Sequence, residues 1–308
     1  MGFLLWLLPL LTLLIFALGF SMAAYAVRID RQTLAQARRW QQEHYDISWY
    51  DALEKTDETV ESGDGYRLHV QFLRNPAAQG RYMILSHGYT DNRYGSLKYA
   101  RIYWTLGFHV ILYDLRGHGE NDKTFCTYSI RESKDLAALI AWCRKRFSDV
   151  RTLGLHGESL GAATAVACLK YHPAVDFAVA DCPFSEIGSV LKGGLKQMHL
   201  PPALVHLASL CARIRYGYWF HEMRPIDSLA GNKTPLLFLH GEADSFIPPR
   251  HSERMAEAAG RELAQVRLFP GAGHAASVLT DPAGYEQAVR SFLERIGAIG
   301  KEGETPCD

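Results

Sequence analysis

The pentapeptide Gly157-Glu158-Ser159-Leu160-Gly161 is the stretch of this 308-residue chain best suited to chemistry. It follows the largely apolar run 150–155 and precedes the small-residue run 162–168, a context that predicts a strand, a sharp turn and a helix. A serine at the centre of G-x-S-x-G sits on a strained turn, where the flanking glycines let strand and helix approach closely and the hydroxyl stays accessible. The motif therefore predicts that Ser159 is a nucleophile.

A serine hydroxyl is a weak nucleophile until a base takes its proton, so the prediction requires a histidine and a carboxylate to orient it. Asp244 follows the apolar run 235–239, and His274 follows the last such run, 266–269. If both runs are parallel strands, these side chains reach the sheet edge where Ser159 lies. The chain order of serine, acid and histidine also suits a hydrolytic triad.

Other residues are alternatives for the two partners. Asp181 ends one predicted strand and Asp114 follows another, although such aspartates more often cap turns. Glu242 is a weaker candidate acid that we expect to be solvated. His118 is the alternative base, but it precedes the serine in the chain and lies in a turn after an earlier strand.

Attack on an acyl group also needs two preorganised donors for the developing oxyanion. The backbone N–H of Leu160, at the start of the predicted helix, is one candidate. The loop His87-Gly88-Tyr89 supplies the other, because Gly88 permits a tight turn that directs the Tyr89 N–H inward. A plain β-turn is the alternative there. The predicted site comprises Ser159, Asp244 and His274, the amides of Tyr89 and Leu160, and the glycines Gly88, Gly157 and Gly161.

The first 27 residues contain no charged side chain, and as a helix they would cross the ~30 Å hydrocarbon core of a bilayer. Ala24-Tyr25-Ala26 resembles a signal-peptide cleavage site, but no basic residue precedes Arg28 and the apolar stretch is long. These features favour an uncleaved single-pass anchor, residues 1–27, that contacts the membrane through residues 3–27. Arg28, Arg31, Arg38 and Arg39 follow this segment. By the positive-inside tendency they favour a catalytic domain on the cytoplasmic side of the membrane, and the opposite orientation is the alternative.

The composition of the chain limits the classes of molecule that it could bind. The chain is 48% hydrophobic with a formal net charge of zero, and it lacks the basic stripe with interleaved aromatics that nucleic acid requires. We expect a monomer that binds no nucleic acid. The six cysteines show no metal-ligand spacing, so we expect reduced thiols and no metal site.

Beyond the anchor, short apolar runs alternate with segments of helical period, which predicts an α/β domain with a mostly parallel sheet. The predicted strands are 66–73, 81–86, 108–113, 150–155, 177–181, 235–239 and 266–269; the predicted helices are 97–106, 131–146, 160–171, 250–259 and 281–296.

The connection between the strands ending at 181 and starting at 235 is too long to be structureless. It has helical character over 190–206 and 208–220, interrupted by Pro201-Pro202, and we expect a helical cap over the site. The predicted division is an anchor at 1–27, a largely helical connector at 28–58, a catalytic domain at 59–182 and 234–299, a cap at 183–233 and a tail at 300–308.

With these motifs together, the chain resembles the α/β-hydrolase superfamily, in particular its serine-aminopeptidase-like, membrane-anchored branch. The resemblance covers about 59–299 and rests on His87-Gly88-Tyr89, 113–119, 157–161, 240–244 with Ile247-Pro248, and 271–274. It implies an eight-stranded, mostly parallel sheet covered by helices on both faces, a cap after the sixth strand, no cofactor, and hydrolysis of ester, thioester or amide bonds through an acyl-enzyme.

The leading prediction is a membrane-anchored carboxylesterase or lipase-like enzyme whose substrate is an acyl ester or lipid. An aminopeptidase-like serine peptidase that cleaves a peptide substrate is the first alternative. A non-catalytic binding protein on a hydrolase fold is the second, and the presence of all triad and oxyanion elements argues against it.

Overall fold

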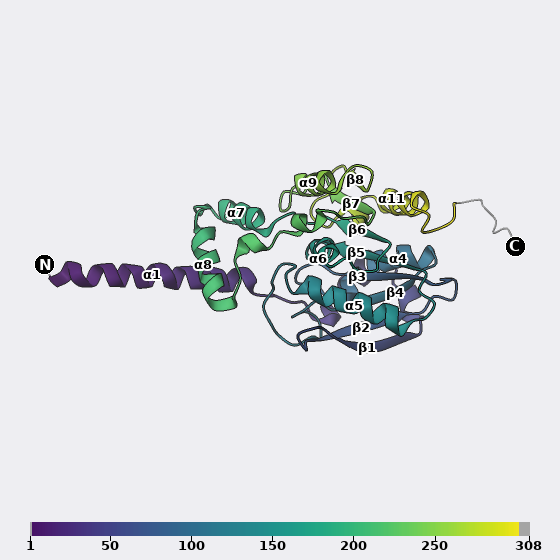
Figure 1. The fold of residues 1–308 in the computed structure, drawn as a ribbon, viewed down its shortest axis with the longest axis horizontal. Coiled ribbons are helices and arrows are strands. Elements are labelled where there is room, and N and C mark those ends of the chain that lie inside the picture. Colours follow the sequence, from purple (N-terminus) through teal and green to yellow (C-terminus); the bar gives the residue numbers. More distant parts are fainter. Residues whose placement is uncertain (1, 302–308) are drawn as a thin grey trace.

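An eight-stranded sheet forms the centre of the computed structural model, which describes residues 2–301 (Figure 1). Its strands are β1 (Lys55–Glu61), β2 (Arg67–Leu73), β3 (Arg81–Ser86), β4 (His109–Tyr113), β5 (Thr152–Glu158), β6 (Phe177–Asp181), β7 (Leu236–Gly241) and β8 (Ala264–Phe269), in the order β1-β2-β4-β3-β5-β6-β7-β8. The pairs β1–β2 and β2–β4 are antiparallel, and every later pair is parallel. The predicted α/β-hydrolase architecture is confirmed.

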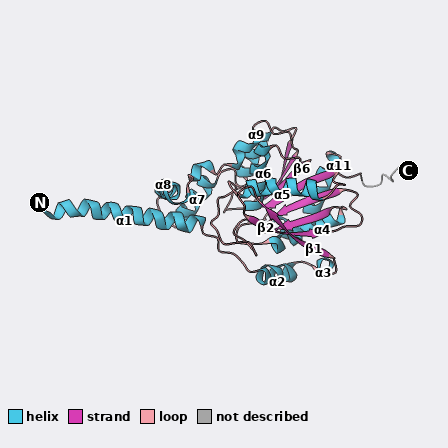
Figure 2. Cartoon of the chain, turned by 60° about the horizontal axis from the view of Figure 1, so that its bottom comes forward, coloured by secondary structure: helices cyan, strands magenta, loops and turns pink. Residues whose placement is uncertain are grey.

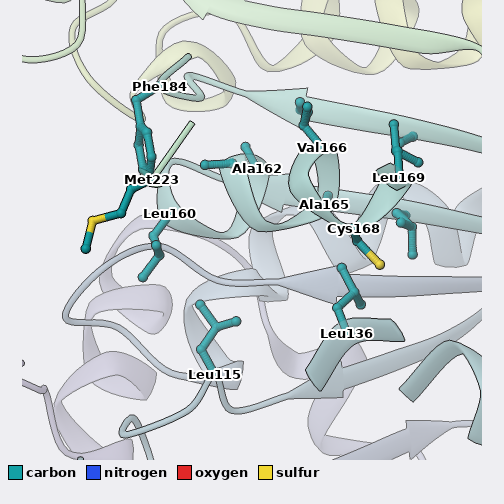
Figure 3. Packing of buried hydrophobic residues seen from close by; sticks show 14 of the residues in the cluster. Leu115, Leu136, Leu160, Ala162, Ala165, Val166, Cys168, Leu169, Phe184 and Met223 are labelled. Atoms are coloured by element: carbon teal, nitrogen blue, oxygen red, sulfur yellow. The ribbon is translucent and has the colours of Figure 1, made fainter. Parts of the chain in front are cut away.

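Helices cover both faces of the sheet, as a parallel sheet requires. One face packs against α5 (Glu132–Arg146), α6 (Leu160–Cys168) and α9 (Arg250–Ala259), and the other against α4 (Leu97–Thr105) and α11 (Pro282–Arg295). All residues of α6 are buried, because its small side chains let the helix fit between strands, α5 and the loops. In Figure 3, Leu160 points toward Leu115 and Cys168 lies beside Leu136. This packing fixes the helix that begins directly after Ser159.

Two helices, α7 (Ile187–Gln197) and α8 (Leu204–Tyr216), lie between β6 and β7. Both end earlier than the predicted segments 190–206 and 208–220. The first helix ends before Pro201-Pro202, which cannot continue it. The second ends at Gly217, whose φ of 90° stops a helix in the left-handed conformation.

The connector between α1 and the sheet contains two helices and the start of a strand. It contains α2 (Leu34–His44), α3 (Ser48–Asp51) and the start of β1, so the predicted boundary at 58/59 falls inside a strand. β1 escaped sequence analysis because it is an edge strand of mostly polar residues, with Val60 as its one buried side chain. Cys126, Cys143, Cys168, Cys182 and Cys211 are buried free thiols. Cys307, with tail residues 302–308, lies outside the described residues.

The apolar helix α1 (Gly2–Val27) extends away from the sheet in both views of the chain (Figures 1 and 2). Within residues 2–301, it is the one helix long and apolar enough to cross a bilayer. Leu11, Leu13 and Leu14 are exposed in its first half, whereas Ala23 and Val27 are buried in its second half. The second half of α1 packs against α8. The helix therefore has a free half and a docked half.

Candidate active site

Ser159 occupies the turn between β5 and α6 with φ 51° and ψ −109°, a conformation that is strained for a residue with a Cβ. Its N–H donates to the carbonyl of Asp181 at 2.8 Å, and its own carbonyl accepts from Ala163 N at 2.9 Å. A Cβ on Gly161 would overlap the backbone of Ser86, and one on Gly157 would overlap the backbone of Gly161. Both glycines are thus needed for the turn to close.

The three side chains predicted to act together form one hydrogen-bonded chain. His274 Nε2 lies 3.0 Å from Ser159 Oγ, and His274 Nδ1 lies 2.7 Å from Asp244 Oδ2. They come from three separate places: the turn after β5, the loop after β7 and the loop after β8. The Asp244 side chain is fully buried, while that of His274 is 24% exposed. The histidine thus faces the site while its acid is shielded from water.

Asp244 is held as a carboxylate. Burial alone would raise its pKa, but hydrogen bonds from His240 and His274, the charge of His274 and the N–H of Ile247 together hold the pKa well below its ordinary value. Its Oδ1 accepts from Phe246 N and Ile247 N, both at 2.9 Å. Because Oδ2 is then an acceptor, Nδ1 of His274 carries the proton and Nε2 is free to accept one from Ser159.

His240 supports this acid, a role that the sequence did not reveal. Its Nε2 lies 2.7 Å from the carbonyl of Ile247 and 3.3 Å from Asp244 Oδ2, and its Nδ1 lies 2.7 Å from Ser252 Oγ. Two acceptors around Nε2 place the ring proton there, so Ser252 donates to Nδ1. His240 lies in the motif His240-Gly241-Glu242-Ala243-Asp244, but its type alone does not distinguish a positioning residue from an ordinary core histidine.

The alternative partners lie elsewhere. Asp181 Oδ2 accepts from the hydroxyls of Tyr99 and Tyr285, each at 3.0 Å. Asp114 pairs with Arg93 in a turn, and Glu242 is exposed. His118 is fully buried with Nδ1 2.9 Å from the carbonyl of Arg116, and burial lowers its pKa to about 3. The side chains of these alternatives therefore take no part in the hydrogen-bonded chain Ser159–His274–Asp244.

Two backbone donors are available near the serine. Leu160 begins α6 directly after Ser159, and Tyr89 lies in the loop after β3 and lines the same cavity. Within residues 2–301 neither amide donates a hydrogen bond to a protein acceptor. Unpaired donors at a helix start and in a tight loop are suited to an anionic oxygen.

A buried ionic network lies beneath the turn. Lys98 Nζ is 2.5 Å from Glu158 Oε2, which also accepts from Tyr99 at 2.6 Å. Burial opposes the charge of Lys98, but Glu158 outweighs it and raises the lysine pKa. Burial raises the pKa of Asp181 to about 6, and the nearby charge of Glu158 adds to the shift. Sequence analysis identified Glu158 only as part of the motif, because its partners Lys98 and Tyr99 come from the distant helix α4.

A cavity of about 710 Å³ opens onto Ser159. Its wall is mainly apolar, and the cap contributes Ile187, Val190, Leu191, Leu195, Val205 and Ala208. Arg28 and Asp30 are the charged residues of the wall, and they form an ion pair with each other. The arrangement suits an apolar group held beside a polar reacting centre. Within the described residues, no three His, Cys, Asp or Glu side chains are grouped as metal ligands.

Comparison with known proteins agrees with this fold. A model of the prolyl oligopeptidase family matches residues 94–297, which include Ser159, Asp244 and His274. The chain is 29% identical over 251 residues to the uncharacterized protein YqkD of Bacillus subtilis, covering 80% of this chain and 82% of that protein. It is 25% identical over 245 residues to the uncharacterized membrane protein YNL320W of Saccharomyces cerevisiae, covering 78% and 80%. The esterase Pf2001 of Pyrococcus furiosus superimposes with a TM-score of 0.67 at 21% identity, covering 81% of this chain and 94% of that one.

Proposed function

The chain belongs to the prolyl oligopeptidase family of α/β hydrolases, and we propose that it is a membrane-anchored serine hydrolase that cleaves carboxylic esters of apolar acyl groups. The observation that carries this proposal is the hydrogen-bonded chain Ser159–His274–Asp244, whose serine lines an apolar cavity. A nucleophile, an oriented base and a place for an acyl chain occur together there.

In the proposed reaction, His274 Nε2 takes the proton of Ser159 Oγ as that oxygen bonds to the acyl carbonyl carbon. The carbonyl oxygen becomes an anion and accepts hydrogen bonds from the amides of Tyr89 and Leu160. The bond to the alcohol oxygen breaks, and His274 gives its proton to that leaving group. Water then attacks the acyl-serine with His274 again as base, and the acid leaves as Ser159 regains its proton. Asp244 stays ionised and stabilises the imidazolium throughout.

A peptidase is the second candidate, because the family takes its name from peptidases. An aminopeptidase must hold the ammonium group of its substrate, usually with a carboxylate. Asp30, the one acid in the described cavity wall, is already paired with Arg28. The wall is otherwise apolar or carries hydroxyl groups, which favours acyl chains over charged peptide ends.

The proposed anchoring rests on α1. The exposed leucines of its free half would be poorly placed in water but well placed in hydrocarbon. The second half packs against the cap, so that the catalytic domain would lie beside the bilayer surface.

The test is Ser159→Ala in the full-length protein in detergent micelles. Hydrolysis of p-nitrophenyl butyrate should fall by at least about 10³-fold, and labelling by a fluorophosphonate should disappear, while the unfolding temperature stays near that of the wild type. Ser185→Ala is a matched control, because Ser185 Oγ also lies near a histidine, 2.8 Å from His251 Nδ1, but away from the cavity wall. Full activity in Ser159→Ala, or loss of labelling in Ser185→Ala alone, would refute the proposal.

A further inference from the structure

The cavity that opens onto Ser159 is not enclosed by the hydrolase domain and cap alone. Four residues of α1 line it: Ser21, Met22, Tyr25 and Ala26. Ser21 and Tyr25 are four residues apart, as are Met22 and Ala26, so the two adjacent pairs lie on one face of the helix. The same helix that is apolar enough to enter a membrane therefore closes one side of the space beside the nucleophile.

The end of α1 is fastened to the loops around the site. Cys126 N donates to the carbonyl of Val27 at 2.9 Å, and the Tyr128 hydroxyl donates to the carbonyl of Ala26. The Tyr89 hydroxyl donates to the carbonyl of Arg28. Since the amide of Tyr89 is one of the two free donors near Ser159, the helix end and that loop hold each other in position.

Close packing also fixes α1 against the cap. A Cβ on Gly19 would lie 2.6 Å from Cys211 Sγ and 2.8 Å from Leu207 Cγ, both on α8. Only a glycine lets the two helices approach this closely. The wall formed by α1 is thus held at two places, by α8 and by the loop 126–128.

The length of the free half places the cavity near the bilayer. The part of α1 before Phe16 spans about 21 Å at 1.5 Å per residue, which is less than the ~30 Å of hydrocarbon in a bilayer. A helix that spans the bilayer must therefore bring part of its docked half, and the cap with it, into the membrane surface. The cap exposes large apolar side chains at Met198, Leu200, Leu210 and Ile214. Such side chains are suited to the lipid interface.

We propose that α1 is a wall of the acyl-binding pocket and that Met22, Tyr25 and Ala26 determine which acyl chains fit. The substrate is then an amphiphile resident in the bilayer, whose acyl chain enters the cavity between α1 and the cap while its ester reaches Ser159. This inference rests on the proposed function, since it names the substrate class of the same site. It makes the anchor a part of the specificity of the enzyme as well as its tether.

Ala26→Trp in the full-length protein in lipid nanodiscs tests it, because an indole would fill the cavity beside the nucleophile. The ratio of kcat/KM for p-nitrophenyl palmitate to that for p-nitrophenyl acetate should fall by about tenfold or more. Ala17→Trp is the matched control: Ala17 is exposed on the same helix and does not line the cavity, so its ratio should equal that of the wild type.

Met22→Ala is a second variant that only removes atoms from the wall. It should raise KM for the palmitate ester several-fold more than KM for the acetate ester, because the longer chain loses more contact with the wall. Palmitate-to-acetate ratios equal to the wild-type ratio in both Ala26→Trp and Met22→Ala would overturn the role of α1. Failure of the proposed function is distinct, because the wild type would then neither hydrolyse the acetate ester nor take up a fluorophosphonate.

Discussion

Replacement of Asp244 by asparagine tests how the acid sets the protonation of His274. Asp244 Oδ1 accepts two backbone hydrogen bonds at 2.9 Å, from Phe246 and Ile247, so the asparagine must keep its carbonyl oxygen at that position. Its amide N–H groups would then face His274 Nδ1, which must become an acceptor. The ring proton moves to Nε2 and is directed at Ser159, so the histidine can no longer take the serine proton.

The size of the effect follows from the loss of the correct tautomer. The opposite orientation of the asparagine would place its amide N–H groups against the N–H groups of Phe246 and Ile247, which costs several kcal/mol for buried unpaired donors. We therefore expect kcat to fall by about 10⁴-fold, or about 5.5 kcal/mol in the activation free energy. The fold should persist, because asparagine matches aspartate in shape.

The assay is kcat for p-nitrophenyl butyrate with full-length protein in micelles, between pH 6 and 9. Asp181→Asn is the control, because Asp181 is a buried strand-end aspartate with no contact to His274 among its hydrogen bonds. Asp181→Asn should keep most of the activity. If Asp244→Asn stays within tenfold of the wild type while Asp181→Asn loses activity, the assignment of the acid is wrong.

Two further predictions concern stability. Burial raises the pKa of Asp181 to about 6, so the folded state favours the neutral carboxyl group. The resulting stabilisation of the fold is fully present below pH 4. About 3 kcal/mol of it is lost as the pH rises through 6. In urea unfolding, the free energy of unfolding of Asp181→Asn should therefore rise relative to that of the wild type between pH 4 and 7. A difference between the two proteins that does not change with pH would contradict this. Gly161→Ala should lower the free energy of unfolding by about 3 kcal/mol or more, because its Cβ would overlap the backbone of Ser86. Gly193→Ala is the control, since Gly193 faces open space in α7, and it should be neutral or stabilising. Equal unfolding midpoints for the two variants would contradict the packing argument.

Much of the sheet was accessible from sequence because buried parallel strands are continuous apolar runs. The segments 81–86 and 177–181 match β3 and β6 at both ends. β1 was missed because an exposed edge strand needs few apolar residues. The helix–strand alternation also gave the order in which Ser159 and its two expected partners reach the same edge of the sheet.

Contacts between distant segments were beyond the reach of the sequence. The pairing of Lys98 with Glu158, and the support of Asp244 by His240, depend on side chains from different elements meeting in three dimensions. The same is true of α1, whose composition indicates a membrane helix but carries no trace of which residues would line a cavity. Periodicity describes an element, whereas a pocket wall is a property of how several elements meet.

The division of α1 at about Phe16 has a consequence for how freely its sequence can vary. The side chains of residues 6–15 are exposed, so another apolar segment of equal length should serve equally well there. If α1 is a wall of the acyl-binding pocket as proposed, the half that follows must carry a glycine opposite Cys211 and side chains of suitable size at 22, 25 and 26. Substitutions in α1 should therefore be tolerated in its first half and constrained in its second half, with the change occurring within one turn.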